Sequence, residues 1–148
     1  MRDAAQFFTI LADEARLEML WLLFNHRELC VCDLMAALEI TQSKASRHLS
    51  TLRHARLVTD RKEGLWSYYA LCPVEDDLAR SHLELLRVSL GKRPHAGALL
   101  AKLHRWLAAK NRGVVCASDS ACGPGKTKAK TKALARRTPQ RQRAGPQP

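Results

Sequence analysis

Residues 32–55 constrain the fold of this chain more than any other segment. Residues 32–39 have the apolar spacing of a short helix. A tight connection ends at Thr41, a suitable N-cap for a second helix over residues 42–55. The inner face of that second helix is apolar and consists of Ala45, Leu49, Leu52 and Ala55 or Leu57, whereas its outer face carries Gln42, Ser43, Ser46, Arg47 and Ser50. Two short helices joined by a tight turn predict a helix-turn-helix.

Two segments rich in β-forming residues follow the second helix. Residues 57–61 and 66–71 have the sequences LVTDR and WSYYAL, and they flank a short loop that contains Gly64. A glycine in a short loop between two such segments predicts a hairpin. A hairpin directly after a helix-turn-helix is the wing of a winged helix. The predicted fold is therefore mainly α with a small β-hairpin, a winged helix-turn-helix.

The polar face of the second helix predicts contacts with DNA. Recognition helices lie in the major groove, where Arg can pair with guanine and Gln with adenine. We expect base contacts from Gln42, Ser43, Ser46 and Arg47, and phosphate contacts from Lys44, His48, Ser50 and Arg53. Arg61 and Lys62 of the wing would reach the flanking backbone or minor groove. The alternative is an ordinary solvated helix face, but the hairpin with its cationic tip favours DNA.

Further helices are predicted on both sides of this unit. Residues 3–24 are helical by period, with Asp13 as N-cap of the second helix in that segment. Residues 75–90 and 96–110 form two more amphipathic helices. Because a small winged domain has little core for both apolar stripes, we expect helix 96–110 and residues 5–11 to form a homodimer surface through the terminal helices. The alternative is that both helices pack within one protomer.

The positive charge is concentrated at the C-terminal end. Residues 1–111 hold 16 Lys and Arg against 13 Asp and Glu, whereas residues 112–148 hold 9 against 1, within a total net charge of +11. Residues 123–148 contain no aromatic and no acidic residue, a composition that predicts disorder. We therefore expect a winged helix-turn-helix DNA-binding and dimerisation domain over 1–111 and a disordered, basic, cysteine-containing tail over 112–148. Basic tails bind phosphates without sequence preference.

Cys30 and Cys32 lie one residue apart at the start of the predicted helix 32–39. Such thiols are soft donors for thiophilic ions, and the helix dipole would lower their pKa. Side chains at i and i+2 do not face each other on a regular helix, so chelation by both requires an irregular or unwound helix start. Distorting that helix would displace residues 42–55. The alternative is that both cysteines are small buried hydrophobes.

Residues 5–111 resemble the ArsR/SmtB family of metalloregulatory repressors. The matching motifs are LADEARL at 11–17 (where the family usually has proline at Glu14), the metal box ELCVCDL at 28–34, QSKASRHL at 42–49 and the wing at 57–69. The resemblance implies a homodimeric repressor of a metal(loid)-resistance operon, bound to double-stranded operator DNA. It further implies that As(III) or Sb(III), as inducer and not as a catalytic cofactor, binds cysteine thiolates and releases the operator.

The third ligand of such a site is not fixed by the box. The arsenite-sensing branch that this box resembles commonly has a cysteine where Met35 stands. A three-thiolate site would then need Cys116, Cys122 or a small-molecule thiol, whereas a methylated arsenical would need only two thiolates. Residues 116–122 look like the cysteine-bearing C-terminus of some arsenic-responsive members. The candidate metal ligands are therefore Cys30, Cys32, Cys116 and Cys122.

Other functions stay open from the sequence. A cadmium-, lead- or zinc-responsive repressor, or one controlled by thiol oxidation, could carry the same box. The zinc sensors of the family use Asp/His pairs, and this chain lacks that pairing, so a solvated face is expected for Asp76, Asp77, His82 and Glu84. Cys72 is expected to be a core residue. A different class is a nucleoid-type architectural protein that binds DNA through its Lys-rich tail.

The sequence argues against an enzyme and against a membrane protein. There is no evident nucleophile with a paired base and no phosphate-binding glycine loop. An apolar run of about 18 residues, which a membrane span needs, is also lacking. Acidic residues Asp3, Asp13 and Glu14 stand where a secretory signal would be apolar. We therefore expect a cytoplasmic protein.

Overall fold

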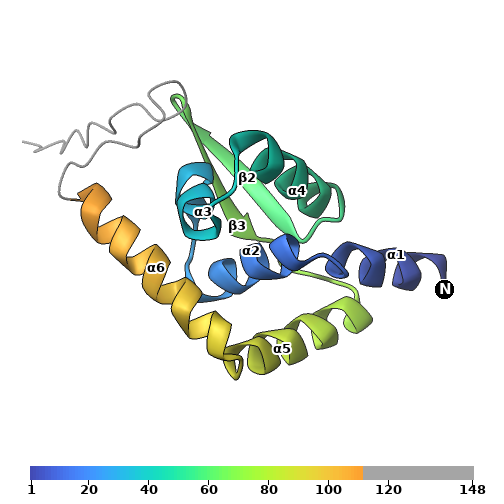
Figure 1. Ribbon diagram of the computed structural model, residues 1–148. Coiled ribbons are helices and arrows are strands. Elements are labelled where there is room, and N and C mark those ends of the chain that lie inside the picture. The colour runs from blue at the N-terminus through green and yellow to red at the C-terminus, as the bar shows by residue number, and fades with distance from the viewer. Residues whose placement is uncertain (112–148) are drawn as a thin grey trace, which may run out of the picture.

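The computed structural model describes residues 1–111, which form six helices and a three-stranded sheet within that range (Figure 1). The elements in chain order are α1 (Arg2–Leu11), α2 (Glu14–Asn25), β1 (Leu29–Cys30), α3 (Val31–Leu38), α4 (Gln42–His54), β2 (Val58–Glu63), β3 (Trp66–Leu71), α5 (Asp77–Gly91) and α6 (Pro94–Asn111). The predictions for the basic tail, including Cys116 and Cys122, fall outside the described residues. The arrangement within residues 1–111 is the predicted winged helix-turn-helix.

Side-chain caps define where the central helices begin. The Asp13 carboxylate accepts a hydrogen bond from the backbone N–H of Arg16, at 3.0 Å, and this starts α2. The Thr41 hydroxyl accepts one from the N–H of Lys44, at 3.4 Å, and this starts α4. Each such cap contributes about 1 kcal/mol to the helix it begins. Both caps were predicted from the sequence, and both are confirmed.

The helix-turn-helix consists of α3 and α4, joined by a turn in which Glu39 has a left-handed backbone. The inner face of α4 is the predicted one, because Ala45, Leu49 and Leu52 are fully buried. These three residues belong to the main core together with Leu34 of α3. The outer face of α4 is thereby left toward solvent.

The sheet has the strand order β1-β3-β2, and both pairings are antiparallel. The β2–β3 hairpin is the predicted wing, with Val58 opposite Leu71 and Glu63 opposite Trp66. Its turn places Gly64 at a φ of +61°, a conformation that glycine adopts without steric cost. The short strand β1, which contains Cys30, was not predicted; it pairs with β3 so that Cys30 lies opposite Tyr68.

Part of the apolar stripe of helix α6 packs within the protomer, which is the alternative that the sequence left open for it, and a dimer surface on residues 96–110 stays a prediction. Ala96, Leu99 and Leu103 are buried in the main core. The Trp21 indole N–H of α2 donates to the backbone carbonyl of Ala96, at 3.0 Å. Figure 1 shows α6 passing along α2 and α3, where these three residues find partners within the protomer.

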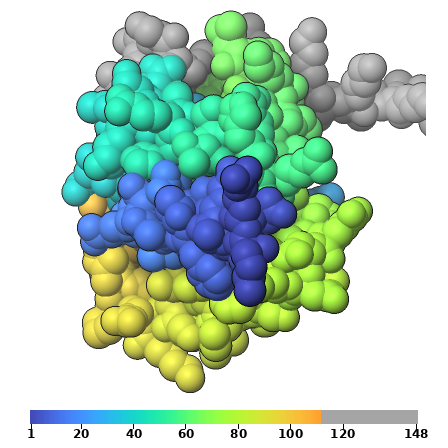
Figure 2. Space-filling model, turned by 90° about the vertical axis from the view of Figure 1, so that its right-hand side faces the viewer, coloured from blue at the N-terminus to red at the C-terminus, as the bar shows by residue number. Residues whose placement is uncertain are grey.

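Most of the exposed large apolar side chains lie on α1 and α5, which Figure 2 shows side by side on one face of the molecule. Phe8 of α1 is 45% exposed, and Leu85 and Val88 of α5 are 61% and 50% exposed. The ring of Phe8 packs edge-on against His82 of α5, with centroids 5.0 Å apart. Residues 5–11 therefore still offer the apolar surface that was expected of them. No helix in residues 1–111 is long and apolar enough to cross a membrane.

Candidate DNA-binding surface and cysteine site

The N-terminal half of α4 presents a continuous polar surface. Five predicted DNA-contact residues are exposed there, namely Gln42, Ser43, Lys44, Ser46 and Arg47. The buried residues Ala45 and Leu49 hold the helix against the core behind them. Side chains of this kind at the start of a recognition helix are those that reach base edges and phosphates.

His48 does not belong to this exposed surface. Its Nδ1 lies 3.5 Å from the Asp13 carboxylate that caps α2, and its side chain is only 14% exposed. His48 therefore joins α4 to the start of α2, and its phosphate contact stays a prediction. Ser50 is half-buried, and its hydroxyl lies 3.3 Å from His54 Nδ1 on the same helix.

The cationic residues near the wing are held by carboxylates. Arg53 donates to Asp60 of β2, at 3.1 Å. Arg61 donates to Glu63 and Glu28, at 2.6 and 2.9 Å. These bonds to Glu63 and then Glu28 raise the pKa of the Arg61 guanidinium. Arg53 and Arg61 are exposed but would have to exchange carboxylates for phosphates in order to bind DNA.

Lys62 lies beside Arg61 on the wing and is exposed as well. It stands opposite Ser67 of β3 in the hairpin register. Nothing in that position conflicts with the predicted contact to the flanking DNA.

The two cysteines of residues 28–34 converge on one point. Cys30 is the N-cap of α3 and has an extended backbone, so its side chain turns back over the first turn of the helix. The Sγ atoms of Cys30 and Cys32 are 2.9 Å apart, and the N–H of Cys32 donates to Cys30 Sγ, at 3.2 Å. The irregular helix start that chelation requires is thus already present, and no unwinding is needed to bring the sulfurs together.

Burial sets the chemistry of the first thiol. Cys30 is fully buried and Cys32 is 6% exposed. Burial raises the pKa of the Cys30 thiol, and the nearby Asp33 carboxylate raises it further, while the Cys32 N–H and the Lys110 ammonium act in the opposite direction. The prediction that the helix dipole lowers this pKa is therefore wrong for Cys30, because desolvation outweighs the dipole.

Aromatic side chains enclose the cysteine pair. Val31, Trp66, Tyr68 and Trp106 pack against it, and Val31 and Trp106 also pack against the main core. Met35, at the position where the resemblance expects a further cysteine, packs against the main core instead. Within residues 1–111 there is no group of three or more His, Cys, Asp or Glu residues that could hold a metal ion. The other candidate ligands, Cys116 and Cys122, lie outside the described residues.

Sequence reasoning missed the residues that connect this pair to α6. Asp33 is 3% exposed, and its carboxylate accepts hydrogen bonds from the Cys30 N–H, at 2.9 Å, and from the Trp106 indole, at 3.0 Å. The Lys110 ammonium lies 2.8 Å from the same carboxylate. Asp33, three residues after Cys30, has the spacing of a capping box, which is a detectable signal. Trp106 and Lys110 gave no such signal.

The remaining predicted side chains are placed as follows. Asp76 caps α5 by accepting from the Ala79 N–H, at 2.8 Å, and Asp77 and Glu84 pair with neighbouring arginines on the surface of α5. His82 is half-buried under Phe8 and so departs from the expected solvated face. Cys72 is half-buried.

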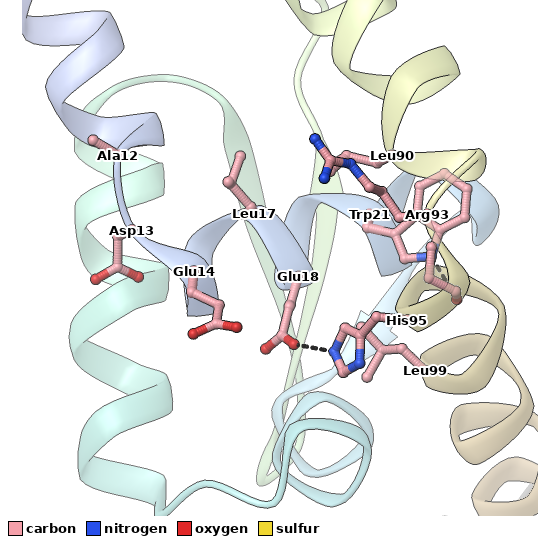
Figure 3. Close-up of a pocket in the computed structure, with 11 residues that line it drawn as sticks. Ala12, Asp13, Glu14, Leu17, Glu18, Trp21, Leu90, Arg93, His95 and Leu99 are labelled. Carbon is pink, nitrogen blue, oxygen red and sulfur yellow. Dashed lines mark hydrogen bonds and ion pairs between the residues drawn. The ribbon is translucent and has the colours of Figure 1, made fainter.

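A hollow of about 460 Å³ lies between the start of α2 and the junction of α5 and α6. Figure 3 shows His95 and Glu18 pointing toward each other across it, with His95 Nε2 and Glu18 Oε1 2.6 Å apart. Leu17, Trp21 and Leu99 line its apolar side. This pair joins α2 to the first turn of α6.

A comparison with family models matches residues 13–60 to the family described as bacterial regulatory protein, arsR family. The "Arsenical resistance operon repressor" of Escherichia coli (strain K12) is 54% identical over 68 residues, which are 46% of this chain and 58% of that protein. The repressor of the same name from Bacillus subtilis (strain 168) is 46% identical over 71 residues, 48% of this chain and 68% of that protein. This chain thus spans less than two thirds of the length of the first of these relatives.

Among solved structures, the homodimeric winged helix-turn-helix DNA-binding domain of Mb0332 from Mycobacterium bovis matches with a TM-score of 0.50 and 26% identity. The match covers 63% of this chain and 82% of that one. Fold, polar recognition helix and wing together define a winged helix-turn-helix DNA-binding regulator. More particularly, the chain belongs to the ArsR family of transcriptional regulators, a family without enzymatic activity, and it is similar to arsenical resistance operon repressors.

Proposed function

We propose that this protein represses a metal(loid)-resistance operon and leaves its operator when As(III) or Sb(III) binds Cys30 and Cys32. The observation that carries the proposal is the 2.9 Å separation of the two Sγ atoms at the start of α3, the first helix of the helix-turn-helix. The similarity to arsenical resistance operon repressors supports the same conclusion.

The polar surface of α4 reads the operator. Arg47 and Gln42 are exposed near the start of the helix, and their side chains can pair with guanine and adenine in the major groove. Lys44 is exposed beside them and suits a phosphate contact. The wing adds Arg61 and Lys62 at the flanking backbone.

A homodimer places two such helices on one duplex. Recognition helices of a dimer must lie about one helical turn of DNA apart. The exposed apolar side chains of Phe8, Leu85 and Val88 supply a surface on α1 and α5 for the partner subunit. Contiguous exposed apolar residues of this kind mark protein–protein contacts.

The donor set fits a soft, thiophilic ligand. In the reduced protein, two converging sulfur donors suit arsenic(III) or antimony(III) better than harder ions. A bound metalloid supplies bonds to both sulfurs. Because Cys30 caps α3, any change in the position of its sulfur acts on the first turn of the helix on which α4 rests. Allosteric couplings are typically about 5- to 150-fold in affinity, and we expect operator release of that size.

The test is fluorescence anisotropy of a labelled duplex from this protein's own promoter, with full-length reduced protein. We expect arsenite at micromolar concentration, on the order of the protein used, to release the wild type and Cys72→Ser but not Cys30→Ser. Cys72 is a matched control because it is a partly buried thiol outside the cysteine cluster. Binding that no arsenite concentration weakens would overturn the proposal.

Two further arms of the same titration address the alternatives. Release by cadmium or zinc but not arsenite would indicate a sensor of another metal. Release by an oxidant alone, reversed by a reductant, would indicate a thiol-redox repressor. Either outcome would keep the operator-binding role and replace the inducer.

A further inference from the structure

Asp33 is the one buried charged residue among residues 1–111. Burying a carboxylate is costly unless it is paired and hydrogen-bonded. Its two oxygens accept from three groups, the Cys30 N–H, the Trp106 indole and the Lys110 ammonium. The first belongs to the cysteine pair, and the other two belong to α6, more than 70 residues further along the chain.

The two α6 residues lie beside the cysteine pair. Trp106 packs against the cluster of Cys30 and Cys32, and Lys110 lies one turn further along the same helix face. The Lys110 ammonium is 5.3 Å from the centroid of Trp66, which encloses the pair from β3. Figure 1 shows the C-terminal half of α6 alongside α3. Trp106 and Lys110 in the last turns of α6 thus form a cover over the cysteine site.

We propose that Asp33 is a positioning residue that holds the cover of α6 closed over Cys30 and Cys32, so that a soft ion reaches both sulfurs only when the Trp106 and Lys110 bonds to Asp33 are released. The inference rests on the proposed function for the identity of the ion. The inference extends the proposed function, because it makes α6 a second helix, besides α4, whose position depends on the cysteine site.

The same carboxylate links both sides of the site. Asp33 receives the Cys30 N–H through one oxygen, Oδ2, and the Trp106 and Lys110 donors through the other, Oδ1. A shift of the first turn of α3 therefore moves the Asp33 carboxylate, which accepts the hydrogen bonds from Trp106 and Lys110 of α6. Metalloid binding and opening of the cover are consequently coupled in both directions.

The chain offers a matched control on the same helix. Lys102 of α6 also reaches a carboxylate at α3, because it lies 2.7 Å from Glu39, the C-cap residue of that helix. That pair is largely exposed and lies outside the cysteine cluster. Lys102→Met therefore removes the same kind of cross-helix contact without touching the cover.

The experiment measures how fast N-ethylmaleimide modifies the peptide carrying Cys30 and Cys32 in full-length, reduced, metal-free protein, by mass spectrometry. Lys110→Met and Trp106→Phe are expected to raise this rate at least about tenfold, the lower end of what is expected when a hydrogen bond to a charged group is lost. Lys102→Met is expected to leave it unchanged. Loss of the Lys110 charge alone would raise the pKa of the Cys30 thiol and slow modification, so a faster rate reports access.

Cys72 is the internal reference in every sample. The proposal is overturned if the cysteine pair is modified no faster in Lys110→Met and Trp106→Phe than in Lys102→Met. It is also overturned if the modification rate of Cys72 rises by the same factor, because that reports general unfolding. The second measurement is the arsenite concentration for half-release of the duplex, expected to fall in Lys110→Met. If arsenite does not release the wild type, the proposed function fails, while the modification rates still decide whether the cover exists.

Discussion

At the scale of single residues, His26 is the side chain whose protonation opposes folding. Its Nε2 is a buried nitrogen without a hydrogen-bond partner among the described residues, and its ring packs edge-on against His104, with centroids 5.4 Å apart. Burial lowers the pKa of His26, the nearby His104 lowers it further, and Asp33 acts in the opposite direction. The folded protein therefore holds His26 neutral, whereas the unfolded chain binds a proton near pH 6.5.

Because the unfolded chain binds more protons, the contribution of His26 to the free energy of unfolding is complete above pH 6.5. It is lost as the pH falls from there toward the lowered pKa. We expect His26→Phe to lose less stability than the wild type between about pH 7 and pH 5, as measured by urea unfolding. His54→Gln, at an exposed histidine of α4, should lose as much free energy of unfolding per pH unit as the wild type. Equal slopes for all three proteins would contradict this assignment.

At the scale of elements, α4 and the wing were predictable because their evidence is local. Periodicity marked Ala45, Leu49 and Leu52 as the inner face, and Thr41 marked the start of the helix. Strand β1 was not predictable, because a two-residue strand has no periodicity and exists only through its pairing with β3. The same holds for the contacts of Trp106, which is joined to Asp33 across 73 positions of the chain.

The cysteine site likewise combines features that the local sequence predicts with features that depend on long-range packing. The two thiols and their soft-donor chemistry follow from residues 28–34 alone, and so does the capping role of Asp33. The burial of Cys30 depends on Trp66, Tyr68 and Trp106, which come from other elements. The direction of the thiol's pKa shift therefore required the packed structure, since desolvation and the dipole act in opposite directions.

The outer face of α4 carries a prediction for this element. Arg47 is exposed, whereas its neighbour His48 is turned toward Asp13. We expect Arg47→Ala to weaken operator binding by about 1–3 kcal/mol and to reduce the preference for operator over a scrambled duplex. His48→Ala is expected to lower the thermal midpoint while leaving that preference intact. Anisotropy titrations of both variants with both duplexes measure this preference. If His48→Ala lost the preference for the operator and Arg47→Ala kept it, the assignment of Arg47 as the base-reading residue would be wrong.

At the scale of the whole molecule, we expect the charge on residues 123–148 to add affinity for DNA without specificity. This segment carries eight Lys and Arg and no acid. We expect its deletion to weaken binding to operator and scrambled duplexes by the same factor and to make the dependence of log K on log salt less steep. Anisotropy at several salt concentrations measures both. If deletion abolished binding altogether, the tail rather than α4 would be the main DNA-binding element.

The apolar face of α1 and α5 carries the last prediction, because the proposed function requires a dimer that reads a two-site operator. Leu85 is 61% exposed, and Val88 follows one turn later on the same side of α5. A carboxylate buried at that face would be unpaired, so we expect Leu85→Glu to be monomeric in sedimentation equilibrium and to bind a two-site operator with reduced affinity. The matched control is Leu65→Glu, at an 85% exposed leucine in the turn of the wing, which should remain dimeric. A dimeric Leu85→Glu would move the subunit interface away from α5. The interface would then have to be sought on the other surfaces of residues 1–111, including the half-buried and exposed face of α6.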